Sequence, residues 1–149
     1  MEAGISAVTC HLVVRGAAEA IDFYRLAFGA VEVFRMTDPG DGRVGHAELR
    51  FGETLVMLAD EYPDFGALGP DSIGGSPVIL HLQTNDVDAL VKRAVAAGAT
   101  LLRAPADQSY GERVGQVLDP FGHRWTLDQR IEELHPAEMQ RRWDEENAA

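Results

Sequence analysis

The chain has 149 residues, of which 46% are hydrophobic and 7% aromatic, a composition typical of one compact folded domain. Its formal net charge of −11 argues against a nucleic-acid partner, because such proteins gather Lys and Arg on one face. No apolar run approaches the roughly 18 residues of a membrane-spanning helix, so we expect no membrane partner.

The N-terminal segment and the single cysteine predict a cytoplasmic protein. Met1-Glu2-Ala3-Gly4 shows neither the basic nor the apolar region of a signal peptide. Cys10 cannot form an internal disulfide, which fits a reducing compartment.

The first half of the chain predicts a strand, a helix and three further strands. Residues 8–14 alternate and are rich in β-formers, and residues 17–28 carry apolar side chains at helical spacing before Gly29. Further strands are expected at 31–36, 45–51 and 54–59, with a loop over 37–43.

The second half predicts the same order after an irregular stretch over residues 60–77, which is either a connector or a lid. The expected elements are a strand at 78–84, a helix at 87–97, strands at 100–103, 114–118 and 123–128, and a loop at 104–112. Pro136 stands at a plausible first position of a short C-terminal helix.

The two halves repeat with an offset of 70 residues, which relates His11 to His81 and Phe51 to Phe121. This period is too long for a solenoid. We therefore predict an α+β fold: two tandem βαβββ modules that form a cup-shaped, eight-stranded mixed sheet with the helices outside. A single domain over 1–149 is expected, with module one at about 5–60, a linker at 61–77, module two at about 78–130 and a helical tail at 131–149.

Several motifs carry a family resemblance over roughly residues 5 to 130. They are Ala20-Ile21-Asp22-Phe23-Tyr24, Phe28-Gly29-Ala30, Gly45-His46-Ala47-Glu48-Leu49, Val56-Met57-Leu58-Ala59-Asp60, Asp86-Val87-Asp88-Ala89 and Asp119-Pro120-Phe121-Gly122-His123. The chain resembles the vicinal oxygen chelate superfamily, and within it the glyoxalase/bleomycin-resistance proteins of the PhnB-like type. That superfamily includes metal-dependent isomerases, ring-cleaving dioxygenases, thiol transferases and drug-binding proteins, so the fold does not decide the function.

The resemblance also implies where a metal would bind. Metal-dependent members place His, Gln or Glu on the first strand and a carboxylate on the last strand of each module. Matching the motifs puts Thr9, Met57, Ile79 and Thr126 at these four positions. None is a usual ligand of a divalent cation, so we expect no metal, no other cofactor and no catalytic residue set.

A shift of two residues gives a second reading, because a strand presents the same face at every second residue. It brings His11 and His81 onto the cavity face, related by the internal repeat, with His46 and Glu48 nearby. These side chains could hold a metal, but we interpret them as hydrogen-bonding, pH-sensitive residues of a pocket.

Three further residues complete the candidate set. Tyr110 and Arg113 can offer a ring face and a planar donor fork to a flat ligand, or can belong to a solvated loop with a salt bridge. Met57 suits the adaptable apolar floor of a pocket. Trp125 is expected to point toward the helices and into the core.

The sequence thus predicts a small-molecule-binding protein that sequesters a bulky natural product or antibiotic, as bleomycin-resistance proteins do. The acidic balance suits a cationic drug. The candidate ligand-binding residues are Thr9, His11, His46, Glu48, Met57, His81, Tyr110, Arg113 and Thr126.

The alternative is an enzyme: a metal-dependent lyase, isomerase or dioxygenase that holds a divalent metal with His11, His46, Glu48 and His81. A homodimer is expected under either reading, because such cups commonly close against a partner and Trp143 in the polar tail needs cover.

Overall fold

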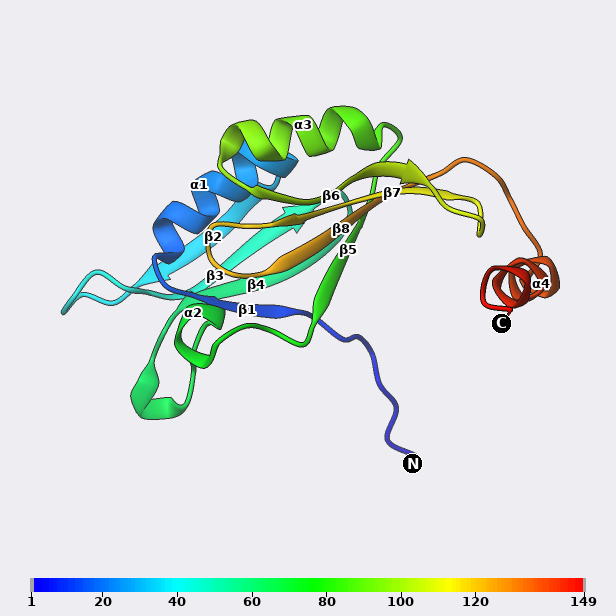
Figure 1. Cartoon of the computed structure of the whole chain (residues 1–149). Helices are drawn as coiled ribbons and strands as arrows, with labels where there is room; N and C mark the ends of the chain where they lie inside the picture. Colours follow the sequence, from blue (N-terminus) through cyan, green and yellow to red (C-terminus); the bar gives the residue numbers. More distant parts are fainter. Residues whose placement is uncertain (1, 149) are drawn as a thin grey trace. The chain divides into compact units, whose positions relative to one another are not determined.

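The computed structural model describes residues 2–148 and divides into two compact units, one ending at Ser76 and one beginning at Pro77. Each unit contains one four-stranded mixed sheet with a long helix against it (Figure 1). The predicted α+β class with two βαβββ modules is confirmed.

The first unit follows the predicted order of elements. They are β1 (His11–Val14), α1 (Ala17–Phe28), β2 (Val31–Thr37), β3 (Val44–Phe51) and β4 (Thr54–Asp60), then the 3-10 helix η1 (Pro63–Phe65) and α2 (Pro70–Ile73). The sheet order is β1-β4-β3-β2, with β1 parallel to β4 and the other pairs antiparallel. The first strand therefore lies beside the last strand of its module.

The second unit repeats this topology. Its elements are β5 (Ile79–Gln83), α3 (Val87–Ala97), β6 (Thr100–Asp107), β7 (Glu112–Leu118), β8 (Arg124–Arg130) and α4 (Pro136–Glu146). The sheet order is β5-β8-β7-β6, again with one parallel pair, β5 with β8. None of the helices among residues 2–148 is both long and apolar enough to cross a membrane.

The two long helices begin against the sheets in different ways. Before α1, Gly16 has a left-handed backbone and no side chain to cap the helix. The Asp60 carboxylate at the end of β4 accepts instead from the amides of Gly16 and Ala17, at 3.0 and 2.8 Å, and from the Val44 amide at 2.7 Å. Before α3, Asp86 caps its own helix by accepting from the Ala89 amide.

Each sheet buries one face beneath its helix, and alternation decides which residues lie there. In the first unit the buried side chains of the strands include Leu12, Val14, Leu49 and Leu58, and in the second Val117, Trp125 and Leu127. Trp125 is therefore in the core, as predicted. At Gly115 an added Cβ would lie 2.9 Å from Val91 of α3, so glycine allows this close approach.

The Asp119-Pro120-Phe121-Gly122-His123 motif forms the turn between β7 and β8 around a buried carboxylate. Asp119 is 3% exposed and accepts from the amides of Phe121 and His123 and from the Trp125 indole nitrogen at 2.9 Å. The motif therefore joins the turn to the core.

The predicted helices at 17–28 and 87–97 are confirmed, but several strand boundaries are corrected, most clearly those of β1 and β6. β1 begins at His11, so Thr9 precedes the sheet and is exposed. β6 continues to Asp107, so the loop before β7 is shorter than predicted. Pro105 does not end β6, because β6 is an edge strand and its pairing with β7 is already irregular there.

Candidate functional site

A row of side chains crosses the open face of the first sheet. His11 on β1 pairs with Met57 on β4, Met57 pairs with Glu48 on β3, and Glu48 pairs with Phe34 on β2. Residues directly opposite on neighbouring strands share a face, and the residues between them on β1, β3 and β4 form the core beneath α1. The row therefore lies on the face that α1 does not cover.

His46 completes this group from the same face of β3. Its Nε2 lies 3.0 Å from Glu48 Oε2, and its ring centroid is 6.2 Å from that of His11 and 5.8 Å from that of Phe34. Burial, and then the charge of His46, lower the pKa of His11. The structure thus brings together four predicted residues of the first module: His11, His46, Glu48 and Met57.

The second sheet carries a corresponding row with different chemistry. His81 on β5 pairs with Thr126 on β8, and Thr126 pairs with Gln116 on β7, which donates to the Thr126 hydroxyl at 3.1 Å. His81 Nδ1 lies 3.2 Å from Oδ2 of Asp128. Asp128 is a buried residue of β8, two positions after Thr126. His81 and Thr126 are therefore neighbours.

Strand pairing shows which residues of the first strands lie opposite Met57 and Thr126. The residues opposite Met57 and Thr126 are His11 and His81. Thr9 lies before β1, and Ile79 pairs with Arg124. The pairing thus places His11 and His81 opposite Met57 and Thr126, whereas the proposed ligand positions of Thr9 and Ile79 stay predictions.

The donor sets on these rows do not fit a divalent metal. Met57 and Thr126 occupy the last-strand positions, where a thioether and a hydroxyl replace the expected carboxylates. Among the residues that the structure describes in either unit, no group of three or more His, Cys, Asp or Glu side chains is placed to hold a metal ion.

Tyr110 and Arg113 do not join the His81 row. Arg113 alternates with Glu112 and Val114 along β7 and points toward α3, where Asp88 accepts from it at 2.8 and 2.9 Å. Asp107 takes another of its donors at 2.9 Å, and these two carboxylates raise the pKa of Arg113. Tyr110 lies in the β6–β7 loop, 40% exposed, where partial burial raises its pKa.

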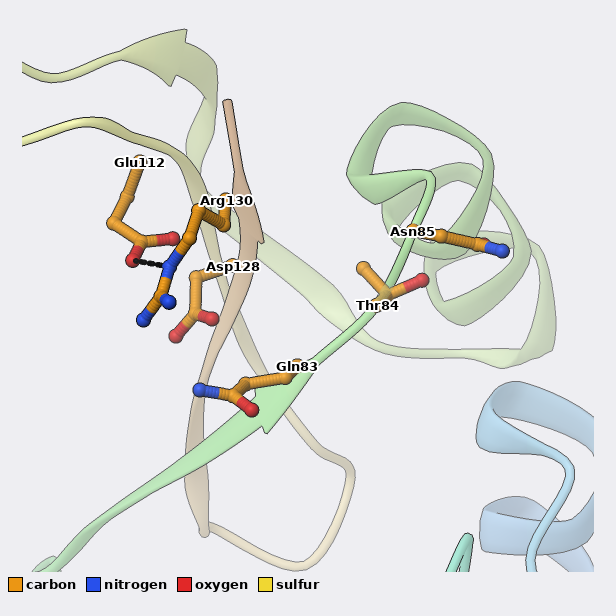
Figure 2. A pocket seen from close by; sticks show the side chains of 6 residues that line it. All are labelled: Gln83, Thr84, Asn85, Glu112, Asp128 and Arg130. Carbon is orange, nitrogen blue, oxygen red and sulfur yellow. Dashed lines mark ion pairs between the residues drawn. The ribbon is translucent and has the colours of Figure 1, made fainter. Parts of the chain in front are cut away.

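A polar pocket at the end of the second sheet was not predicted as a whole (Figure 2). It has a volume of about 500 Å³ and is lined by Gln83, Thr84, Asn85, Glu112, Asp128 and Arg130. Asp128 connects it to His81. One sequence signal could have indicated this pocket: alternation along the last strand puts Thr126, Asp128 and Arg130 on one face. Of these three residues, only Thr126 stood at an expected ligand position.

The profile of the Glyoxalase/Bleomycin resistance protein/Dioxygenase superfamily matches residues 5–127. The chain belongs to this superfamily. A protein of Mycobacterium tuberculosis (strain H37Rv) is 48% identical over 137 residues, covering 90% of this chain and 80% of that protein. The predicted family resemblance is confirmed.

Several solved structures are similar to this chain in fold. The structure of a gene product from Arabidopsis thaliana has a TM-score of 0.67 at 27% identity, covering 83% of this chain and 98% of that one. TioX from Micromonospora sp. ML1 has a TM-score of 0.66 at 26% identity, covering 85% and 100%. A PhnB protein from Bacillus cereus, 19% identical with a TM-score of 0.66 over 83% and 99%, supports the fold alone.

Proposed function

We propose that the protein binds and sequesters a bulky small molecule, a natural product or antibiotic, without a metal centre. The observation that carries this proposal is the pairing of His11 with Met57 and of His81 with Thr126. The two histidines lie on the first strands directly opposite Met57 and Thr126 of the last strands, and these last-strand side chains suit an organic ligand.

The open face of the first sheet supports contact with an apolar or aromatic ligand. The thioether of Met57 adapts to irregular apolar shapes, and the partly exposed ring of Phe34 offers a stacking surface. His11, His46 and Glu48 add polar groups that could orient such a ligand. This combination is typical of small-molecule sites.

The second candidate function is a metal-dependent lyase, isomerase or dioxygenase. What favours it is the presence of a histidine on the first strand of each module, directly opposite a last-strand position at which the resemblance implies a metal ligand. Elemental analysis after purification without chelator separates the two proposals. We expect well below one equivalent of zinc, iron, nickel or manganese per chain, and close to one equivalent would favour the enzyme.

A thermal-shift screen against natural products and antibiotics tests the binding proposal itself. A ligand at 100 times its dissociation constant adds about 2.7 kcal/mol to stability, which raises Tm by roughly 5–10 °C for a chain of this size. Hits should shift backbone amide signals around His11, Met57, His81 and Thr126 in NMR spectra. A broad library without a hit would contradict sequestration. The cytoplasmic location and the homodimer stay predictions alongside this proposal.

A further inference from the structure

The polar pocket lies wholly within the second unit, where three strands of one sheet begin or end. Gln83 ends β5, Glu112 begins β7 and Arg130 ends β8, while Thr84 and Asn85 lead from β5 into α3 (Figure 2). Its volume of about 500 Å³ lies within the range of small-molecule pockets. It could therefore hold a substantial group of a ligand.

Asp128 provides an open acceptor in this pocket. Its Oδ2 contacts His81 Nδ1, but no described residue donates a hydrogen bond to its Oδ1. That oxygen is not fully buried, because it is not one of the buried side-chain atoms of residues 2–148 that lack a partner. Gln83, the partner of Asp128 on β5, extends its amide toward the carboxylate (Figure 2).

Glu112 adds a second negative charge, which is ion-paired with Arg130. Its Oε1 lies 3.6 Å from Arg130 Nε, too far for a hydrogen bond, and its Oε2 is buried with no hydrogen-bond partner among residues 2–148. A buried acceptor without a donor costs free energy, which a donor from a ligand would recover. The Arg130 side chain is 63% exposed and can turn away without losing a packed position.

We propose that this pocket binds the ammonium group of an organic amine. Its N–H groups donate to Asp128 Oδ1 and to the Gln83 side-chain oxygen, and Glu112 supplies the second negative charge. Two carboxylates face one guanidinium here, so the lining favours a cation over an anion. The net charge of −11 attracts cations toward the protein as a whole. This inference rests on the proposed function and assigns its ligand to the class of cationic amines.

The test is an NMR titration of the ¹⁵N-labelled full chain at neutral pH with benzylamine, and with benzyl alcohol as its uncharged counterpart. Benzylamine should shift the amide signals of residues 83–85, 112 and 128–130 and should bind more weakly as salt is added. Asp128→Asn and Glu112→Gln should each weaken binding roughly tenfold, the effect of losing a charged partner. Asp144→Asn, which changes a carboxylate of α4 outside the pocket, should leave binding unchanged.

Three results would overturn the proposal: equal shifts with benzyl alcohol, no benzylamine shifts at the pocket, or an equal loss of affinity in Asp144→Asn. Thermal melts establish whether each variant is folded. If Asp128→Asn does not fold, the affinity of Glu112→Gln alone tests the proposal. The same experiments distinguish an error in the amine-pocket proposal from an error in the proposed sequestration function. Screen hits that map to the first unit, without benzylamine binding, would contradict only the amine pocket. Benzylamine binding alongside an empty screen would contradict only sequestration.

Discussion

The two sheets share a topology and a histidine on the first strand, but the side chains around that histidine differ between their open faces. In the first unit, His11 lies opposite Met57 and near the imidazole ring of His46, which in turn lies near the ring of Phe34. In the second, His81 lies opposite Thr126 and contacts Asp128, whose carboxylate leads into a polar pocket. The duplicated scaffold has thus kept the position of the histidine while its surroundings diverged.

The structural supports of the two modules diverged in the same way. Asp60 at the end of β4 holds the start of α1, whereas Gln129 near the end of β8 accepts only from the Val87 amide at the start of α3. The β3–β4 turn is short, at Gly52-Glu53, whereas the β7–β8 turn is organised by Asp119. Each module therefore depends on a different buried or half-buried carboxylate.

The largest effect is expected from the second module's turn. Asp119→Ala leaves two backbone amides and the Trp125 indole without their acceptor, so it should destabilise the protein by about 4 kcal/mol. Urea unfolding measures the loss, and Glu53→Ala in the corresponding turn of the first module is the matched control with a change within about 0.5 kcal/mol. Equal losses would contradict the contrast between the turns.

The helix starts give the next largest contrast. Asp60→Ala removes the acceptor of three backbone amides and should cost about 3 kcal/mol, whereas Gln129→Ala removes one and should cost about 1 kcal/mol. Asp86 still caps α3 in the second variant. Denaturant midpoints of the two variants, compared at equal m-values, check this order. A larger loss in Gln129→Ala would show that Asp60 is not the main support of α1.

Ligand affinity sharpens the comparison of the open faces. Loss of one hydrogen bond to a ligand costs roughly 0.5–3 kcal/mol, so His11→Ala and His81→Ala should weaken binding of a screen hit by about 2-fold to 150-fold. Met57→Ala should weaken binding through lost apolar contact. Calorimetric titration of each variant measures these losses. If all three variants bind like the wild type, the ligand does not occupy these faces.

The smallest expected effect is the pH dependence that His11 adds to stability. Its pKa in the folded protein is below 6.5, so the folded state disfavours its protonation relative to the unfolded chain. The stability from neutral His11 is fully present above about pH 6.5 and is lost as pH falls through the folded pKa. The difference in unfolding free energy between wild type and His11→Gln, measured from pH 8 to 5, should therefore decrease on acidification. If this difference in unfolding free energy increased on acidification, the partly buried environment assigned to His11 would be wrong.

Much of the fold could be predicted because each element carries a local pattern. The apolar spacing of α1 and α3 and the glycines that follow them fix both helices at the predicted residues. The entry points of strands were less predictable, since β1 is defined by where it meets β4 rather than by its own β-formers. That dependence on a distant strand explains why Thr9 was predicted to lie in the first strand but precedes it.

The candidate site was predictable only in part, for related reasons. Alternation along β3 identified His46 and Glu48 as neighbours, and the repeat identified His11 and His81. Arg113 was interpreted as a loop residue, but β7 begins one residue before it, and alternation then directs it to Asp88 of α3. The pocket around Asp128 combines residues from three strands, and a local sequence pattern cannot show that these strands meet there.

The central claim is that this member of the superfamily binds its ligand without a metal. Its most direct test is a calorimetric titration of a screen hit into chelator-treated protein, repeated after addition of zinc, nickel, manganese or ferrous iron. We expect the same dissociation constant, within about twofold, in every case. Binding that disappears on chelation and returns with one of these metals would contradict it.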